Sequence, residues 1–307
     1  MSIHSISTAN TLNGITIDSA FNTNKKIAAK FIAPDARVLI VDDIDTNLKI
    51  AAGLLRPYKM QVELCDSGRE AIEALKLKSY DLIFMDHMMP EMDGIEATAA
   101  IRDLEKEQSI KSKKQIPIIA LTANAVPGIR EMFLEKGFND FLSKPIDISR
   151  LEEILDHWIP QEKKKKTGNM DDADHTSLLQ PATSGTEPLI IPGVDVEFGI
   201  KMTGGTAEFY IQTLAIFLKD TEERLPIVQT APSADDLPLF VINIHAIKSA
   251  AASIGAAKVS TTAKELEAAG NAKDLALINK LLPDFIESIT ILIKDIKSSL
   301  KSYAEKE

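Results

Sequence analysis

The segment DLIFMDHMMPEMDG, residues 81–94, decides the fold class, because a short apolar run ends at an aspartate and leads through a turn into a periodic segment. Four other short apolar runs occur in the first half of the chain: VLIV (38–41), QVELC (61–65), IPIIAL (116–121) and DFLS (140–143). Segments with apolar residues spaced near 3.6 alternate with these runs, at 46–55, 68–78, 94–107, 127–137 and 148–159. Continuous apolar strands that alternate with helices are typical of a parallel sheet covered on both faces. The sequence therefore predicts an α/β fold, a doubly wound five-stranded parallel sheet, over residues 36–160.

The rest of the chain follows other patterns. Helical periodicity without strand-like alternation occurs at 194–202, 206–229, 236–255, 258–270 and 273–306. This pattern predicts an all-α helical bundle over residues 193–307. Residues 161–192 combine a lysine run, acids and Ser, Thr, Gly and Pro, which predicts a flexible linker. Residues 1–35 are expected to be an N-terminal extension, partly disordered or a short helix.

The composition limits the class of protein. The 307 residues include 35 Lys and Arg against 45 Asp and Glu, a formal charge of −10. This acidic balance opposes binding to phosphate backbones, so we expect no nucleic-acid partner. The single cysteine, Cys65, excludes an internal disulfide. No stretch approaches the roughly 20 apolar residues needed to cross a bilayer. We therefore expect no membrane insertion and a cytoplasmic protein.

Three carboxylates follow strands of the predicted sheet. Asp42 and Asp43 come after the first apolar run, and Asp86 ends the third. In a doubly wound sheet these strand ends meet at a crevice, where crowded carboxylates need a counter-ion such as Mg²⁺. Thr122 and Lys144 end the fourth and fifth strands at the same edge, where a hydroxyl and an ammonium could hold phosphoryl oxygens. Asp45 or Thr46 is expected to cap the helix that follows Asp43, and His87 is expected to be a rim residue that points away from Asp86.

This constellation resembles the receiver domain of two-component response regulators, because VDD, MDHMMPEMDG, LTANA and SKP match that family in order and spacing over residues 37–158. The resemblance implies a flavodoxin-like fold in which Asp86 accepts a phosphoryl group. It implies Mg²⁺ bound by Asp43, Asp86 and the Met88 carbonyl, with help from Asp42. Lys144 and Thr122 would hold the phosphoryl group. Thr122 and Phe141 would repack together as a switch, and the Lys144–Pro145 bond matches one that is usually cis in the family.

A lone histidine is the candidate in the helical half. Ile244, Ile247, Ala251 and Ile254 form an apolar stripe, and His245 lies nearly opposite it, on a face with Lys248, Ser249 and Ala252. The imidazole is therefore expected to project to solvent among small side chains, where another protein could approach closely. An imidazole is a good nucleophile near neutral pH.

The segment HAIKSAAASIGA followed by KELEAAG resembles the histidine phosphotransfer (HPt) domain, a helical bundle whose exposed histidine carries phosphate between receivers. The resemblance extends weakly over residues 193–300. It implies that His245 is a phosphoacceptor and that Lys248, Ser249 and Ala252 line a docking face. Ser249 stands where many members of the family have glycine.

A receiver joined to an HPt domain predicts a phosphorelay protein that passes phosphoryl groups between Asp86 and histidines, including His245, with Mg²⁺. Its expected partners are a sensor histidine kinase and other receiver or HPt proteins. Since no ATP-binding kinase motif is recognisable, the enzyme class stays open. Three alternatives also stay open: a binding module that sequesters kinases or receivers, a phosphate sink, and the C-terminal part of a hybrid sensor kinase.

Overall fold

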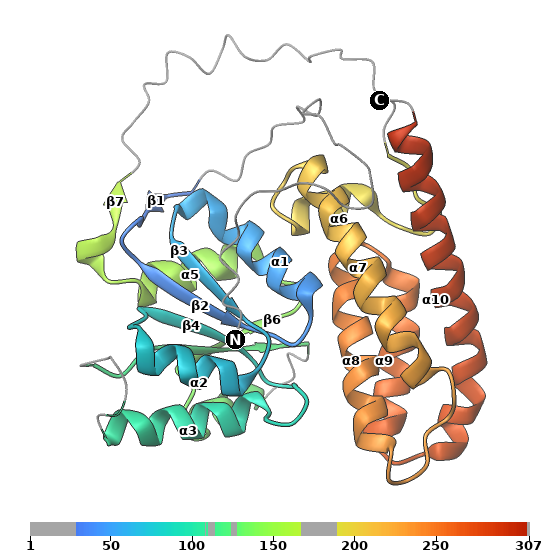
Figure 1. Ribbon diagram of the computed structural model, residues 1–307, viewed down its shortest axis with the longest axis horizontal. Coiled ribbons are helices and arrows are strands. Elements are labelled where there is room, and N and C mark those ends of the chain that lie inside the picture. The colour runs from blue at the N-terminus through green and yellow to red at the C-terminus, as the bar shows by residue number, and fades with distance from the viewer. Residues whose placement is uncertain (1–28, 108, 110–113, 124–127, 167–188, 306–307) are drawn as a thin grey trace.

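The computed structural model describes residues 29–107, 109, 114–123, 128–166 and 189–305. Figure 1 shows a layered α/β domain beside a helical bundle. Residues 1–28 and 167–188, which include most of the predicted N-terminal extension and linker, lie outside the described residues. Within the described residues, no helix combines the length and apolar character needed to cross a membrane.

The sheet has the predicted parallel arrangement, with the strand order β3-β2-β4-β5-β6. Its strands are β2 (Arg37–Val41), β3 (Gln61–Cys65), β4 (Leu82–Asp86), β5 (Ile118–Thr122) and β6 (Asp140–Ser143). β2 pairs with both β3 and β4. The chain therefore reverses its winding direction at β2, which brings the carboxyl ends of β2 and β4 together at one crevice.

Helices cover both faces of this sheet. They are α1 (Asp45–Leu55), α2 (Gly68–Leu77), α3 (Gly94–Lys106), α4 (Ile129–Glu135) and α5 (Ile148–Trp158), with the short helix η1 (Arg56–Tyr58) after α1. One core contains residues of α1 and α5 and the other contains residues of α2, α3 and α4. Alternate residues of β2 divide between the two cores, with Val38 and Ile40 in the first and Leu39 and Val41 in the second. The continuous apolar strands thus reflect burial on both faces.

The packed α/β domain extends beyond the predicted limits of 36 and 160. A two-residue strand, β1 (Phe31–Ile32), pairs with β7 (Lys165–Lys166), which follows the short helix η2 (Gln161–Lys163). Phe31 is 7% exposed and belongs to the same core as α1 and α5. Two segments that the composition assigned to the N-terminal extension and the linker therefore contribute to this domain. The sequence pattern did not predict this, because pairing between distant segments leaves no local periodicity.

The helical half forms a bundle around one core. Its helices are α6 (Val196–Met202), α7 (Ala207–Val228), α8 (Leu237–Ser253), α9 (Ala257–Asn271) and α10 (Leu275–Ala304). The predicted stripe of α8 is buried in that core, with Ile244, Ala251 and Ile254 at 0% exposure. Ile191, from the predicted linker, is also buried there.

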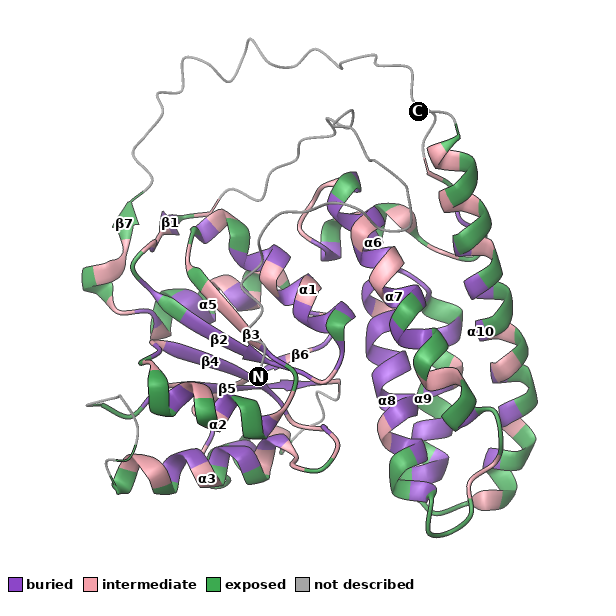
Figure 2. Ribbon diagram, in the orientation of Figure 1, coloured by how far each residue is buried: buried purple, intermediate pink, exposed green. Residues whose placement is uncertain are grey.

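The two domains pack against each other through α1 and α7, which lie side by side in Figure 1. A Cβ atom at Gly53 of α1 would lie 2.4 Å from Phe209 Cε1 and 3.0 Å from the Thr203 carbonyl oxygen. Figure 2 shows buried residues on the sides of α1, α7 and α8 that face the junction. The absence of a side chain at Gly53 therefore permits this close approach.

Candidate functional site

The three predicted carboxylates converge where β2 and β4 end. Single oxygen atoms of Asp42, Asp43 and Asp86 all lie within 4.8 Å of one another. Asp42 and Asp86 are fully buried. This convergence follows from the direct pairing of β2 with β4, which places both strand ends at the same edge of the sheet.

Lys144 is the cation at the centre of this cluster. Its Nζ lies 2.6 Å from Asp42 Oδ2 and 3.0 Å from Asp86 Oδ2, and its side chain is 5% exposed. Asp42 Oδ1 also accepts hydrogen bonds from the Ile44 N–H and from Asn47 Nδ2. Asp86 Oδ1 accepts from the His87 N–H at 2.9 Å. One buried ammonium therefore bridges the two innermost carboxylates.

The environment shifts the pKa values of these groups in opposite directions. Burial raises the pKa of Asp42 to about 7, although Lys144 opposes the shift. Burial also raises the pKa of Asp43. Burial alone would raise the pKa of Asp86 as well, but Lys144, the His87 side chain and His245 together hold it below its ordinary value. The lowered pKa favours the ionised form of Asp86, which is the form in which a carboxylate can act as a nucleophile.

The donor set fits Mg²⁺. Three carboxylates face each other, and hard oxygen ligands of this kind suit a small divalent cation. Asp86 Oδ2 is buried and accepts no hydrogen bond from the described residues, so this oxygen has capacity for a ligand beyond the Lys144 ion pair. Asp43, whose side chain is 9% exposed, lies at the outer side of the cluster.

The structure also brings the remaining predicted receiver residues to this edge. Thr122 ends β5 and is fully buried, and its carbonyl accepts from the Lys144 N–H. Phe141 is partly buried against the core that contains α2, α3 and α4. The Lys144–Pro145 peptide bond is cis, as the family resemblance implied. Met88 follows β4 and packs against the core of the helical bundle, so the loop after Asp86 reaches the second domain.

The prediction that His245 projects to solvent is wrong, because the α/β domain covers that face of α8. His245 is 1% exposed. Its ring lies 5.4 Å from the His87 ring, centroid to centroid. One ligand atom each of Asp86, His87 and His245 lie within 4.8 Å of one another. The two predicted phosphoacceptors therefore face each other across the domain junction.

Glu267 of α9 fixes the orientation of the His245 ring. Its Oε1 lies 2.6 Å from His245 Nδ1, and its other oxygen accepts from Lys248. Although burial would raise the pKa of Glu267, His245 and Lys248 lower it to about 2, so the carboxylate is ionised. Burial lowers the pKa of His245 although Glu267 opposes the shift. An ionised carboxylate can only accept a hydrogen bond, so Nδ1 carries the proton and Nε2 has the free lone pair.

The His245 Nε2 atom is buried and has no hydrogen-bond partner among the described residues. Since the opposite ring nitrogen is held by Glu267, Nε2 is the atom available toward Asp86. The predicted docking face surrounds it: Lys248 and Ser249 are buried, and Ala252 is half-buried. This face of α8 is therefore occupied by the chain's own α/β domain.

His87 differs from the expected rim residue. Its Nδ1 lies 3.0 Å from the Leu121 carbonyl oxygen and 3.7 Å from Asp86 Oδ1, and its side chain is 14% exposed. Its ring makes edge contacts with both His245 and Phe133. His87 therefore lies between the two domains. This position depends on the second domain, so no pattern in the receiver sequence could have predicted it.

Sequence reasoning missed the contacts that Asp220 and Arg224 make between the domains. Asp220 of α7 accepts from both the N–H and the hydroxyl of Thr46, and Arg224 donates to Asp43. Neither Asp45 nor Thr46 caps α1: the N-cap residue is Ile44, which makes no side-chain capping bond. The one sequence signal that could have suggested these contacts is the spacing of Asp220 and Arg224, which lie one helical turn apart and therefore on one face of α7.

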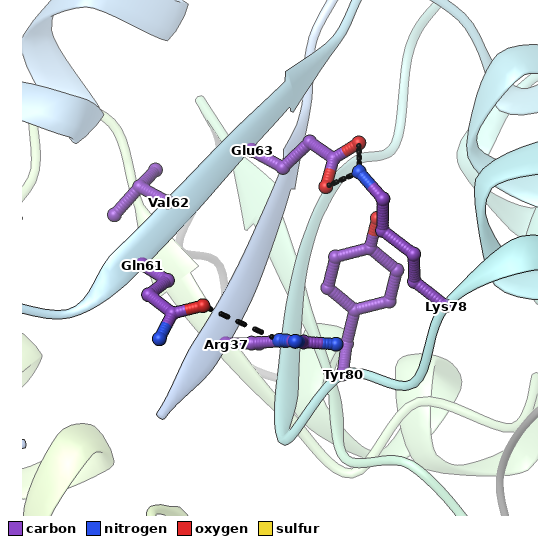
Figure 3. A pocket seen from close by; sticks show the side chains of 6 residues that line it. All are labelled: Arg37, Gln61, Val62, Glu63, Lys78 and Tyr80. Carbon is purple, nitrogen blue, oxygen red and sulfur yellow. Dashed lines mark hydrogen bonds and ion pairs between the residues drawn. The ribbon is translucent and has the colours of Figure 1, made fainter. Parts of the chain in front are cut away.

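A surface pocket of about 150 Å³, drawn in Figure 3, lies where β2 and β3 begin. It is lined by Arg37, Gln61, Val62, Glu63, Lys78 and Tyr80. Two of its charged groups bond to each other, with Lys78 Nζ at 2.9 and 3.0 Å from the two oxygens of Glu63, and Arg37 Nε donates to Gln61 Oε1 at 3.3 Å. Arg37 and Gln61 begin β2 and β3, so this pocket is remote from the carboxylates that follow the strand ends.

Two family models match the chain. Residues 38–156 match the response regulator receiver domain, and residues 212–300 match the Hpt domain. The signal transduction histidine-protein kinase BarA of Escherichia coli K12 is 44% identical over 123 residues, which are 40% of this chain and 13% of BarA. The sensor protein GacS of Pseudomonas syringae is 28% identical over 239 residues, which are 75% of this chain and 24% of GacS. The chain thus spans a quarter or less of these relatives.

Two solved structures match part of the chain. The receiver domain of the sensor histidine kinase PA1611 of Pseudomonas aeruginosa, solved with a magnesium ion in its active-site cleft, is 36% identical, with a TM-score of 0.35. That match covers 40% of this chain and 96% of the other. The complex of Ypd1 with the receiver domain of Ssk1 from Saccharomyces cerevisiae contains a chain that is 35% identical, with a TM-score of 0.39, covering 43% and 94% of the two chains.

The sequence motifs, the strand order, the strand-end carboxylates and both family models agree on the same assignment. Residues 38–156 therefore belong to the response regulator receiver family, and residues 212–300 belong to the Hpt family.

Proposed function

We propose that this chain is a phosphorelay component in which a phosphoryl group passes between Asp86 and His245 of the same molecule. One observation carries the proposal: a nitrogen of the buried His245 ring lies within 4.8 Å of an oxygen of the buried Asp86 carboxylate, and Nε2 of that ring has no hydrogen-bond partner among the described residues. A nucleophile and its phosphorylated partner held at short range convert a bimolecular transfer into a unimolecular one.

In the first step an Asp86 oxygen attacks the phosphorus of an incoming donor, and the bond from phosphorus to the donor breaks. In the second step His245 Nε2 attacks the phosphorus, the bond to Asp86 breaks, and the carboxylate is regenerated. The imidazole gains positive charge because its Nδ1 keeps its proton. Glu267 stabilises this charge through the 2.6 Å contact with Nδ1.

Three other groups support the transfer. Lys144, bonded to Asp42 and close to Asp86, would hold a phosphoryl oxygen, and Thr122 would hold another. Asp43, Asp86 and the Met88 carbonyl would hold Mg²⁺, with Asp42 assisting. Bound Mg²⁺ supplies positive charge that offsets the charge of the phosphoryl oxygens. Repacking of Thr122 and Phe141 would report the phosphorylated state.

The source of the phosphoryl group is a sensor histidine kinase, with other receiver or HPt proteins as further partners. The relatives BarA and GacS are named as a signal transduction histidine-protein kinase and a sensor protein, and this chain corresponds to only part of each. The chain therefore acts either as a separate relay protein or as the C-terminal part of a hybrid kinase.

Phosphoryl mapping tests this function. The full chain is incubated with Mg²⁺ and acetyl phosphate, and the modified residues are located by mass spectrometry and by the different acid and base stabilities of the two phosphoryl bonds. Phosphate is expected on Asp86 and His245 in the wild type and on Asp86 alone in His245→Ala. A wild-type chain that takes up no phosphate would contradict the relay function and favour a sequestering module.

Replacement of Glu267 by Gln should slow the second step selectively. A neutral amide stabilises the developing imidazolium less well, and charge-assisted bonds contribute about 1.5–3 kcal/mol, so labelling of His245 should fall about 10- to 100-fold. Uptake at Asp86 should stay unchanged when measured in the His245→Ala background. Glu265→Gln, a change at an exposed residue of the same helix, is the matched control. Equal rates in Glu267→Gln and the control would show that Glu267 has no such role.

A further inference from the structure

Helix α7 carries two charged residues, one turn apart, that reach from the bundle into the receiver. Asp220 Oδ2 accepts hydrogen bonds from the Thr46 N–H at 2.8 Å and the Thr46 hydroxyl at 2.6 Å. Arg224 Nη2 donates to both the carboxylate and the carbonyl oxygen of Asp43, each at 2.9 Å. These contacts involve the first turn of α1 and the carboxylate cluster itself, so they connect docking directly to the site.

Asp220 supplies the capping group that α1 lacks. The first N–H groups of a helix have no partner within the helix, and the N-cap residue of α1, Ile44, offers no side-chain acceptor. A carboxylate also interacts favourably with the positive end of the helix dipole. Asp220 is 8% exposed and Thr46 is fully buried, so this cap lies in a site that excludes water. The bundle therefore completes a helix that belongs to the other domain.

Arg224 connects the cluster to the helix that carries His245. Its Nη1 donates to Asn243 Oδ1 at 3.0 Å, and Asn243 lies two residues before His245 on α8. Asn243 is in turn held by the carbonyl of Leu239, to which its amide donates at 2.8 Å. Arg224 thus fixes the position of α8 relative to Asp43, and Asp43 lies beside Asp86.

Weaker contacts extend this junction along both helices. Lys49 donates to Gln212 at 3.1 Å, and its Nζ lies 4.6 Å from the centre of the Phe209 ring. Lys219 pairs with Asp45 at 3.2 Å, but both side chains are more than half exposed, so this pair contributes little. The contacts of Asp220 and Arg224 are less exposed than the Lys219–Asp45 pair and therefore contribute more to the junction.

We propose that Asp220 and Arg224 are specificity-determining residues that select the receiver docked on the bundle and set His245 opposite Asp86. The receiver that they fit has a hydroxyl residue in the first turn of its first helix, three residues after the second acid of the acidic pair, as this chain's own receiver does with Thr46. The proposal that Asp220 and Arg224 select the docked receiver is independent of the transfer chemistry. The proposal that they promote phosphoryl transfer from Asp86 to His245 rests on the proposed function.

Variants at both ends of the cap test this proposal. Asp220→Ala removes an acceptor of two bonds, one of them from a buried hydroxyl, and should lower labelling of His245 by about 10- to 100-fold. Thr46→Val should have a smaller effect, because its backbone N–H remains. The double variant should lose little more than Asp220→Ala alone, since both changes remove the same interaction. Asp220→Asn, which keeps an acceptor oxygen, should restore part of the rate.

Two controls separate selection from general damage. Glu223→Gln, at an exposed position on the same helix, should leave labelling of His245 unchanged. Asp220→Ala combined with His245→Ala should take up phosphate at Asp86 at the rate of His245→Ala alone. Hydrogen exchange should quicken at the amides of residues 45–48 in Asp220→Ala, whereas exchange in α9 and α10 should stay the same.

The outcomes separate this proposal from the proposed function. If the wild type labels His245 and both Asp220→Ala and Thr46→Val do so at the same rate, the selection by Asp220 is overturned and the relay stands. If the wild type never labels His245, the relay within the chain fails, and hydrogen exchange alone decides the docking role. Unchanged exchange at residues 45–48 in Asp220→Ala would overturn that role.

Discussion

A mixture of Asp86→Asn and His245→Ala chains is expected to leave His245 almost unlabelled, although each chain has one intact acceptor. In the wild type the two proposed acceptors, Asp86 and His245, lie close together within one molecule. Tethered groups have effective concentrations in the millimolar range, so at about 1 μM chain the reaction between molecules should be about 1,000-fold slower. In the mixture, the docked receiver of each Asp86→Asn chain also covers its own His245, which is 1% exposed in the wild-type arrangement.

The measurement is the amount of phosphohistidine formed with acetyl phosphate and Mg²⁺ over a fixed time. Wild-type labelling per chain should not change on tenfold dilution, because a reaction within one molecule is independent of concentration. The His245→Ala chain confirms that Asp86 still takes up phosphate. Wild-type levels of phosphohistidine in the mixture would rule out exchange within one molecule and assign the two sites to separate partners.

Replacement of Lys144 by Met should both destabilise the receiver and suppress phosphoryl uptake. The Lys144 ammonium lies between the fully buried carboxylates of Asp42 and Asp86, at 2.6 and 3.0 Å. Removal of one partner from a buried ion pair costs about 3–5 kcal/mol, because the remaining charge is left uncompensated. Uptake at Asp86 should fall about 100- to 1,000-fold, the effect of deleting one preorganised donor to the reacting phosphoryl group.

Urea unfolding without Mg²⁺, followed by tryptophan fluorescence, measures the stability effect. The single tryptophan, Trp158, lies in α5, so the signal reports the receiver and not the bundle. Lys78→Met is the matched control, since Lys78 pairs with Glu63 at the remote pocket of Figure 3 and its side chain is 42% exposed. A pair of that exposure contributes less than about 1 kcal/mol. Equal losses in the two variants would refute the role of Lys144.

The fold of each domain could be predicted from local patterns. Val38 to Val41 are apolar without interruption because β2 is buried on both faces, and this burial also made the parallel sheet predictable. The stripe of Ile244, Ala251 and Ile254 predicted the buried side of α8 because helical periodicity repeats every 3.6 residues. The convergence of Asp42 and Asp86 followed from the general rule that strand ends meet at a switch point.

The environment of His245 could not be predicted in the same way. Helical periodicity identifies the side of α8 that faces its own core, but the opposite side is polar enough to face either water or another domain. Glu267, which holds the imidazole, lies 22 residues away on α9, and the sequence reasoning assigned it no role. Asp220 and Arg224 lie more than 170 residues from Thr46 and Asp43, so no local spacing connects the members of these pairs.

The sequence by itself determined two domains, their folds, and the acceptor candidates Asp86 and His245, because short-range periodicity and strand-end chemistry are encoded within each segment. Only the tertiary structure decided that the two acceptors face each other, that Glu267 sets the imidazole tautomer, and that Asp220 caps α1 from the other domain. These contacts depend on the packing of one finished surface against another, and the residues that form each surface come from distant parts of the chain.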